Sequence, residues 1–480
     1  MWTRGRLVAA AATATAGVAA AFSPLSPLSL ARTGGQVTMA APARAATTIA
    51  APLAVRVVSY NILSSHLAGP AHFVKCKPDD LDADVRIGRV KSALRAHMER
   101  DAVICLQEVS VQYVGQLTPF FEEAGYTFVA GNYGNTFNNY MGVALAWPKA
   151  RFASEAVEIA RAADAKPWPK DPSHVKPPRA EEPVGLARMV RRIEAAGAQI
   201  GRAVAGIWRA PGPAGRKLVG GGPFHLLPSG HSARRFYDAG HFSQLDPWSE
   251  AQRRHNFLVS ARLRCRTSGQ AFSVSTYHMP CLFGSDPKVQ VMTARCHHIC
   301  NHICNHICNH ICNHIQVMTA HAALAAKRAT DFAGGLPCIL AGDFNFDPAS
   351  APYKLLTTGS PHGDPARDPS THPHWPPARA HDPWTPVVPH PFRSAYVEAA
   401  GKEPDFTNLA TTDWQPEPFV GTLDYIFLST GQQGSSGCWR AAAVRALPHR
   451  DAVLPTCQSY PTADEPSDHV AIWADLELTR

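Results

Sequence analysis

The sequence predicts a globular protein of the α/β class, and three observations support this prediction. Short apolar runs that suit buried strands alternate along the chain with segments of helical periodicity. The apolar fraction of 45% is ordinary for a folded protein, and the body of the chain has no apolar run of the about 18 residues that would predict a membrane span. Polar side chains recur at the ends of the apolar runs, which indicates a shared site.

Length and composition narrow the class of protein further. A chain of 480 residues has room for two or three domains, but large sandwich enzymes exceed the usual domain size, so length alone does not decide the number. The net charge of +8 favours a polyanionic partner without requiring one. The 41 prolines fall in blocks, which predicts long irregular insertions in a regular fold.

The first 50 residues have the composition of a targeting segment. They contain four arginines and many small residues, and the first acidic residue of the chain is Asp79. We expect an organellar transit peptide, for a mitochondrion or a plastid, with a secretory signal and an untargeted tail as alternatives. Residues 51–480 are then expected to form a single domain, with insertions at about 149–253, 295–320 and 360–391.

The folded body is predicted to begin with a β-branched strand from Leu53 that ends at Asn61. The spacing of apolar residues between 84 and 100 predicts an amphipathic helix. The next strand, over 101–110, closes with Gln107 and Glu108. Because an unpaired buried carboxylate is strongly unfavourable, this glutamate requires either a bound cation or a salt bridge.

A helix over 111–124 and strands over 126–130 and 141–147 are expected next. From 149 to 253 the chain becomes rich in Pro, Gly, Arg and His, which predicts a long insertion. It contains one basic amphipathic helix, at 184–208, which is either solvated or a contact for nucleic acid or a membrane.

Two strands, at 256–265 and 270–281, are predicted after this insertion, and the second carries His278. Residues 296–315 then form a near-perfect four-residue repeat that would stack Cys and His on one side of a helix, where zinc or copper could bind. The sequence QVMTA flanks the repeat on both sides, so we interpret the repeat as a duplication or low-complexity insert with no designed metal site. The cysteines outside the repeat are scattered and predict no disulfide framework.

The segment 337–348, PCILAGDFNFDP, is the most informative stretch of the chain. Its apolar start predicts a short strand buried on both faces, and Gly342 ends that strand where the backbone approaches another group closely. Alternation places Asp343 and Asn345 on one side of the chain and Phe344 on the other, in packing. A carboxylate beside a carboxamide suits a hydrated cation and a phosphate, although the pair also fits a simple turn.

Two more polar groups follow a second Pro- and His-rich insertion, at 360–391. Asp424 heads the strand DYIFLS, and Asp468 and His469 precede the final strand. Each of these residues could be a turn or surface residue on its own. Six polar strand ends among apolar neighbours make coincidence a poor explanation, so we expect them to share one site.

The ordered motifs SYNIL, LQEV, TYHMP, GDFN, LDYIF and SDH resemble the signature of the endonuclease/exonuclease/phosphatase superfamily over residues 53–478. Segments such as RSAYVEAAGKEPDFTNL are similar to its branch of carbon-catabolite-repressor deadenylases, nocturnin, Angel and the 2′,5′-phosphodiesterases. The resemblance implies a four-layer α/β sandwich, in which two packed mixed β-sheets are flanked by helices and the site lies at the strand ends. The long Pro-rich insertions and the CNHI repeat depart from the family pattern.

The resemblance also implies a role for each polar strand end. The residues it assigns to a Mg²⁺ ion, or to Mn²⁺ in its place, are Glu108 as the leading ligand, Asn61 and Asp468. The residues it assigns to catalysis are His278, Asp343, Asn345, Asp424 and His469. The residues it assigns to substrate binding are Asn256, His278 and Asn345. In this scheme Asp343 with Asn345 activates the attacking water, and His469, oriented by Asp424, acts at the scissile phosphate.

The function implied by the resemblance is a Mg²⁺-dependent phosphodiesterase that hydrolyses RNA. We expect a 3′–5′ exoribonuclease that prefers adenylate tails and acts on single-stranded 3′ ends. The alternatives are a phosphatase for a small substrate such as NADPH or a phosphoinositide, and a DNA repair nuclease. An inactive nucleic-acid-binding module is the non-enzymatic alternative, and the presence of all six motifs argues against it.

Overall fold

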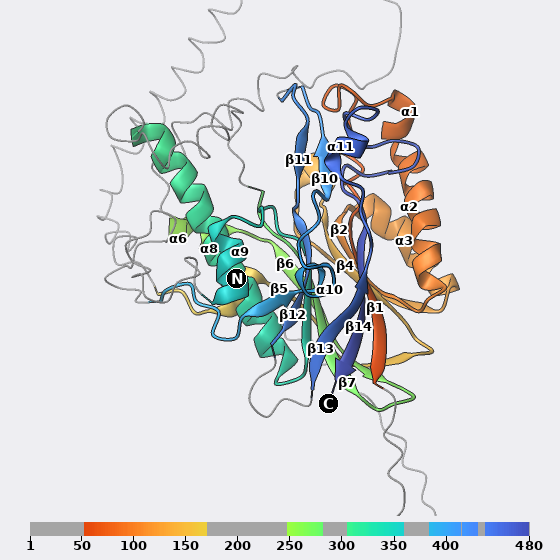
Figure 1. Ribbon diagram of the computed structural model, residues 1–480, viewed down its shortest axis with the longest axis vertical. Helices are drawn as coiled ribbons and strands as arrows, with labels where there is room; N and C mark the ends of the chain where they lie inside the picture. Colours follow the sequence, from red (N-terminus) through yellow and green to blue (C-terminus); the bar gives the residue numbers. More distant parts are fainter. Residues whose placement is uncertain are drawn as a thin grey trace, which may run out of the picture. The chain divides into compact units, whose positions relative to one another are not determined.

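Two mixed β-sheets pack face to face and are covered on their outer sides by helices (Figure 1). The computed structural model describes residues 52–169, 247–281, 305–359, 384–413, 415–430 and 437–479, with side chains from residue 315 onwards in the third range. Contacts group Ala50–Arg480 into one compact unit.

In the described part of the chain, each of the two sheets has six strands. The first has the order β13 (Cys438–Val444), β14 (Ile472–Thr479), β1 (Leu53–Asn61), β2 (Val103–Val109), β4 (Gly142–Pro148), β3 (Tyr126–Asn132). The second has the order β5 (Phe152–Arg161), β6 (Phe257–Cys265), β7 (Ala271–His278), β8 (Cys338–Asp343), β12 (Asp424–Ser429), β9 (Phe392–Ser394). The parallel pairs are β1 with β2 and β7 with β8. A separate ribbon consists of β10 (Asn408–Ala410) and β11 (Phe419–Gly421).

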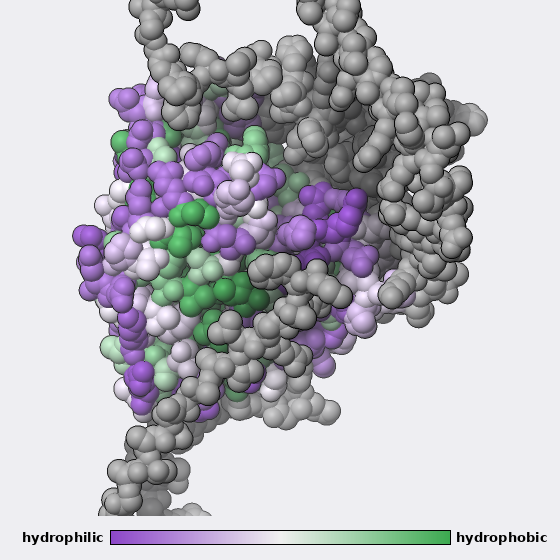
Figure 2. Space-filling model, turned by 180° about the vertical axis from the view of Figure 1, so that it is seen from behind, coloured by the Kyte–Doolittle hydropathy of each residue, from purple (hydrophilic) through white to green (hydrophobic). Residues whose placement is uncertain are grey.

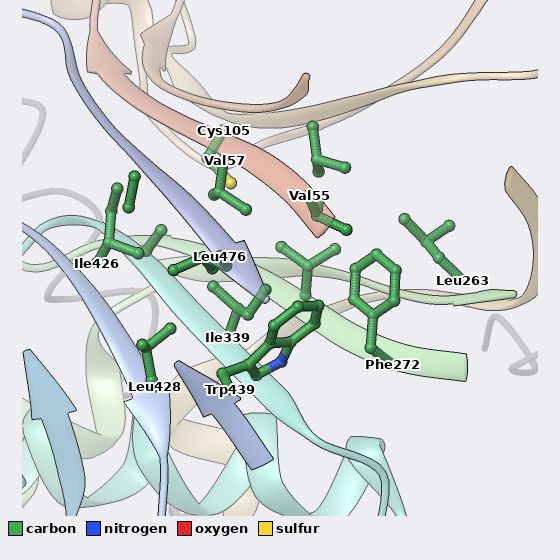
Figure 3. Packing of buried hydrophobic residues seen from close by; sticks show 14 of the residues in the cluster. Val55, Val57, Cys105, Leu263, Phe272, Ile339, Ile426, Leu428, Trp439 and Leu476 are labelled. Carbon is green, nitrogen blue, oxygen red and sulfur yellow. The ribbon is translucent and has the colours of Figure 1, made fainter. Parts of the chain in front are cut away.

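Alternation along the strands directs one set of side chains into the space between the sheets. Val55 and Val57 of β1 are buried there with Ile339 of β8 and Ile426 of β12 (Figure 3). Burying such a side chain contributes about 1.5–3 kcal/mol, so this apolar layer holds the sheets together. Asn61 lies an even number of residues beyond Val57 and therefore on the same inner face. The apolar layer thus gives way to polar side chains at one end of the strands.

Helices cover the outer face of each sheet. On the first sheet, α2 (Ala83–Met98) and α3 (Val111–Glu123) pack on the outward side chains of β1 and β2. On the second sheet, α6 (Pro247–Arg253), α8 (Asn305–Ala333) and α9 (Ala351–Thr358) are close to the outward side chains of β7, β8 and β12. The other described elements are α1 (Pro78–Leu81), η1 (Thr136–Asn138), η2 (Ala162–Ala165), α10 (Ala395–Ala400) and α11 (Arg450–Val453). The predicted four-layer sandwich is confirmed.

The outward-facing surface is consistent with this layering. On the coloured part of the face opposite to that in Figure 1, most residues are hydrophilic and a group of hydrophobic residues lies near the middle (Figure 2). Among the described helices, none combines the length and the apolar character that crossing a membrane requires.

The insertion that the sequence predicts from about residue 149 begins later than expected. Strand β5 occupies Phe152–Arg161 and pairs along its whole length with β6, so this stretch belongs to the second sheet. It is an edge strand with several exposed positions, and its alternating Ala, Glu and Ser carry little of the apolar signal of the central strands. The predicted helix at 184–208 lies outside the described residues, as do 360–383 of the other Pro-rich insertion.

Helix α8 contains the end of the Cys/His repeat and the second copy of QVMTA. The helix begins at Asn305, and in this second copy Val317, Met318 and Ala320 are buried on the outer face of the second sheet. The first copy and the start of the repeat lie outside the described residues. A packed role for one QVMTA copy is consistent with a duplication and leads to a direct test.

Removing the repeat together with one QVMTA copy should leave the fold intact. Deleting residues 295–320 and deleting 290–315 give the same polypeptide, in which the remaining copy directly precedes His321 and can supply the same buried side chains. We expect a soluble protein whose thermal unfolding, followed by circular dichroism, remains cooperative and close to that of the full chain.

Leu324→Asp is the matched control, because it places a charge at a fully buried position of the same helix and should abolish folding. An unfolded deletion protein, or one that loses stoichiometric zinc together with its stability, would show that the repeat is structural.

Candidate active site

Three neighbouring strands of the second sheet bring His278, Asp343 and Asp424 side by side. Asp343 ends β8, where it is paired in register with His278 on β7 and with Asp424 on β12. All three residues are buried, and the Nε2 of His278 lies 3.5 Å from Oδ2 of Asp343. The register of the sheet therefore determines that these three ionisable groups meet.

Glu108 reaches the site because a β-bulge redirects its side chain. Ile104 and Leu106 of β2 face the outer helices, so strict alternation would direct residue 108 the same way, away from the second sheet. The register of β2 with β4 shifts at this point, and Glu108 has a φ of 57°, in the left-handed region. Its carboxylate instead faces Asn61 and a cavity. Residues with a Cβ adopt this conformation rarely, and bulges recur beside active sites.

The side-chain amide of Asn61 joins the two sheets. Its Nδ2 donates to Oε1 of Glu108 at 3.1 Å and to Oδ2 of Asp343 at 2.9 Å. Its Oδ1 accepts from the N–H of Leu63 at 3.0 Å, which orients the amide. The other oxygen of Glu108 accepts from the N–H of Ser64 at 3.0 Å. Two carboxylates from different sheets are therefore held around one neutral donor.

Close backbone packing positions Asp343. A Cβ on Gly342 would lie 1.9 Å from the carbonyl oxygen of Tyr277, so glycine is required for β7 and β8 to approach here. The Oδ1 of Asp343 accepts from the N–H of Asn345 at 2.9 Å in an Asx turn. Burial raises the pKa of Asp343 to about 6, and the charge of Asp424 adds to this effect while the neighbouring histidines oppose it.

His469 and Asp424 form a buried hydrogen-bonded pair. The Nδ1 of His469 lies 2.7 Å from Oδ2 of Asp424, and its Nε2 lies 3.7 Å from Oδ2 of Asp343. Burial alone would lower the pKa of His469, but the carboxylates of Asp424, Asp343 and Asp468 together raise that pKa well above its ordinary value. The surroundings of this imidazole therefore favour its protonated form.

Two predicted substrate contacts also position the end of β7. The Nδ2 of Asn256 donates to the carbonyl oxygen of His278 at 2.8 Å, and the Nδ2 of Asn345 donates to that of Met279 at 2.9 Å. Both asparagines line the same cavity as His278. Their amide nitrogens are thus used for support, which the sequence alone did not indicate.

A buried arginine that sequence reasoning did not select holds the loops of the site together. Arg86 of α2 donates from one terminal nitrogen to the carbonyl oxygens of Ile62 and Pro466, both at 3.0 Å, and from the other to that of Leu63 at 2.6 Å. These bonds tie the end of β1 to the segment that carries the SDH motif. Arg86 precedes the buried Val90 by one helical turn, and that spacing on the apolar face could have revealed it.

The polar side chains open into a cavity of about 1020 Å³. The ionisable side chains at the strand ends and in the segment before β14 that line it are Glu108, His278, Asp343, Asp468 and His469. The Nδ1 of His278 is buried and makes no hydrogen bond with the described residues. All six predicted strand ends therefore meet around or directly behind one cavity.

The carboxylates of this cavity are suited to a hard cation. Burial raises the pKa of Asp468, and the charge of Glu108 adds to this effect while His469 opposes it. Carboxylate and amide oxygens are the ligands preferred by Mg²⁺ and Ca²⁺. Glu108 and Asp468 provide carboxylate oxygens of this kind. The predicted ligand Asn61 instead presents its Nδ2 to Glu108, and its Oδ1 accepts from the N–H of Leu63, so it positions the carboxylate.

A second arrangement could also hold a metal. Asp343, Asp424 and His469 each offer a ligand atom, and these atoms lie within 4.8 Å of one another. However, Asp424 does not line the cavity, and its short bond to His469 already uses the Nδ1 of that ring. We therefore interpret Asp424 as the partner of His469.

Comparisons with known sequences agree with these motifs. The chain matches the sequence model of the Endonuclease/Exonuclease/phosphatase family over residues 58–469. Human 2′,5′-phosphodiesterase 12 is 29% identical over 165 residues, which cover 34% of this chain and 23% of that protein. The rat protein of the same name has the same identity and coverage. The match thus spans only a minor part of these relatives.

Comparisons with solved structures concern the fold. A crystal structure of ANGEL2, described as a 2′,3′-cyclic phosphatase, has a TM-score of 0.50 at 15% identity and covers 89% of this chain and 95% of that chain. The human nocturnin catalytic domain has a TM-score of 0.43 at 15% identity and covers 89% and 94%. The likeness to ANGEL2 supports the same sandwich architecture.

Removing the charge of Asp424 should lower the pKa of His469. Asp424→Asn keeps the size of the side chain but removes the carboxylate that favours the imidazolium. Because the pKa is raised in the folded state, the pair stabilises the fold fully below the unfolded pKa of about 6.5 and loses this contribution as pH rises through the folded pKa. Asp424→Asn should therefore have a lower free energy of unfolding than the wild type, and this difference should become smaller at high pH.

NMR titration of the His469 ring, with Asp475→Asn as a control for charge removal elsewhere, measures the effect directly. Asp475 pairs with Arg56 and does not line the cavity, so its substitution should leave the pKa of His469 unchanged. An equal His469 pKa in Asp424→Asn and the wild type would refute the pairing.

Proposed function

Since this chain belongs to the endonuclease/exonuclease/phosphatase family, we propose that it is a Mg²⁺-dependent phosphodiesterase that hydrolyses RNA from single-stranded 3′ ends. The observation that carries the proposal is the meeting of Glu108, Asp343 and Asp468 with two buried histidines in one cavity. The preference for adenylate tails rests on the similarity of the motifs to the deadenylase branch.

The residues of the cavity divide between metal binding and proton handling. Glu108 and Asp468 would hold the cation, with Asn61 orienting Glu108, and the cation when bound would neutralise charge that develops on the phosphate oxygens. Asp343 is oriented by Asn61 and by the N–H of Asn345, so its carboxylate is placed to accept a proton from the attacking water.

The two buried histidines would interact with the negative charge of the phosphate. His469 is held by Asp424 and kept in the protonated form, so it is suited to stabilise negative charge on the phosphate. His278 presents a second imidazole to the cavity beside Asp343, where it would contact a phosphoryl oxygen. The ring of His469 is held by Asp424 before substrate arrives, which lowers the reorganisation that the reaction requires.

A basic wall of the cavity favours a substrate with several phosphates. Arg253 and Arg254 line the cavity, and both pair with the single carboxylate of Glu250, so this wall retains one positive charge. The chain as a whole carries a net charge of +8. Backbone phosphates of a polynucleotide satisfy both features, and their binding should weaken with salt.

A substrate panel with a matched variant tests the proposal. Wild-type protein should hydrolyse oligo(A) in Mg²⁺ faster than oligo(dA) or NADPH, and release mononucleotides from the 3′ end. Glu108→Gln should lose activity by about 10²-fold or more, since it removes a charged metal ligand. Glu123→Gln, at an exposed position of α3, should behave as the wild type.

Folding and metal binding are followed in the same variants. The melting temperature of Glu108→Gln without metal should stay close to that of the wild type, but its increase on addition of Mg²⁺ should disappear. A near-native rate in Glu108→Gln at saturating Mg²⁺ would disprove the metal assignment. Faster turnover of NADPH than of oligo(A) would show that the substrate is a small phosphorylated molecule and not RNA.

A further inference from the structure

We propose that Phe137 is a stacking platform for a base of the substrate, at the rim of the catalytic cavity. This inference rests on the proposed function and names the part of the substrate that the rim recognises. Phe137 lies in η1, between β3 and β4, and its side chain lines the same cavity as Glu108 and Asp343.

The exposure of this ring is unusual for its residue type. Phe137 is 73% exposed, the largest exposed fraction among the large hydrophobic side chains of the described residues. Phenylalanine is normally buried, because its ring gains free energy on leaving water. No packing role in the fold explains a phenylalanine in this position, whereas a ligand that covers the ring would.

The loop that carries Phe137 is held rigidly. The N–H of Phe137 donates to Oδ1 of Asn135 at 2.9 Å, and the N–H of Asn135 donates to Oδ1 of Asn138 at 2.9 Å, which form a capping box. The next two residues, Asn139 and Tyr140, reverse the chain with a φ of 50° each. An aromatic ring on an ordered loop loses little entropy when a ligand binds.

One serine connects this loop to the catalytic carboxylate. The N–H of Ser64 donates to Oε2 of Glu108 at 3.0 Å, and its hydroxyl donates to the carbonyl oxygen of Asn138 at 2.7 Å. Phe137 therefore keeps a fixed position relative to the place where the phosphate is hydrolysed. A nucleotide has a phosphate at one end and a planar base at the other. The carboxylates of the cavity and the ring of Phe137 at its rim are placed to contact these two ends.

A nucleobase is the chemical group that fits these observations. Bases stack on aromatic side chains with little dependence on their sequence, and each such contact changes affinity by about 5–150-fold. The neighbouring wall of Arg253 and Arg254 would accompany the phosphates of the same strand. The ring of Phe137 thus supplies an apolar surface for the base, beside charged side chains that suit the phosphates.

The test compares substrates that differ only in one base. An oligo(A) and its counterpart with a single base-free residue near the 3′ end are hydrolysed by the wild type, Phe137→Ala and Phe137→Tyr. We expect Phe137→Ala to lose about 5–150-fold in kcat/KM on oligo(A) but little on the base-free substrate, with the loss mainly in KM. Phe137→Tyr keeps an aromatic ring, so the ratio of its kcat/KM on oligo(A) to that on the base-free substrate should match the wild type.

A binding measurement gives a readout that does not depend on hydrolysis. Stacking quenches 2-aminopurine, so a labelled oligo(A) should be quenched by the wild type in EDTA and not by Phe137→Ala. Tyr140→Ala is the control, because this residue lies in the same loop and is 47% exposed but does not line the cavity.

The outcomes separate this inference from the proposed function. One outcome is that the wild type hydrolyses oligo(A) while Phe137→Ala lowers kcat/KM equally on both substrates or on neither. In that case the stacking inference is wrong and the phosphodiesterase proposal stands. If the wild type neither binds nor hydrolyses any oligonucleotide, the proposed substrate fails and the inference fails with it.

Discussion

The amide of Asn61 is the contact on which the rest of the site depends. From β1 of the first sheet, its Nδ2 donates to Glu108 of the same sheet and to Asp343 of the second sheet. Two carboxylates in a buried setting repel each other, and a neutral donor between them reduces that repulsion only partly. Burial raises the pKa of Asp343, and the charge of Asp424 adds to this effect. A cation bound in the cavity would compensate this negative charge, so the same geometry would serve both architecture and chemistry.

The site is an extension of the core. The inner faces of β1, β8 and β12 bury valines and isoleucines along most of their length and end in Asn61, Asp343 and Asp424. That apolar layer fixes the spacing and alignment of the sheets. The polar side chains at the strand ends are therefore also held in fixed positions. Two local devices complete the arrangement: the bulge that turns Glu108 inward and the glycine that lets β7 approach β8. Preorganised groups of this kind are the main source of catalytic electrostatics.

Much of this could be predicted from the sequence, because the central strands carry strong apolar signals. The strands that bear Asn61, His278, Asp343 and Asp424 were expected at their observed positions. Periodicity could not place Glu108, since strict alternation directs it to the wrong face and only its motif suggested otherwise. The sequence does not predict edge strand β5, because a strand at the edge of a sheet needs few apolar residues. Contacts between distant segments, such as those of Arg86, depend on tertiary structure that no local pattern contains.

The central claim is that the cation binds between the sheets at Glu108, and the position of Mn²⁺ in a crystal tests it most directly. Anomalous scattering from a crystal soaked in Mn²⁺ locates the ion without reference to activity. We expect one strong peak at bonding distance from a Glu108 oxygen, with Asp468 on the same side of the cavity. A peak bound instead among Asp343, Asp424 and His469, or no peak at millimolar Mn²⁺, would contradict it.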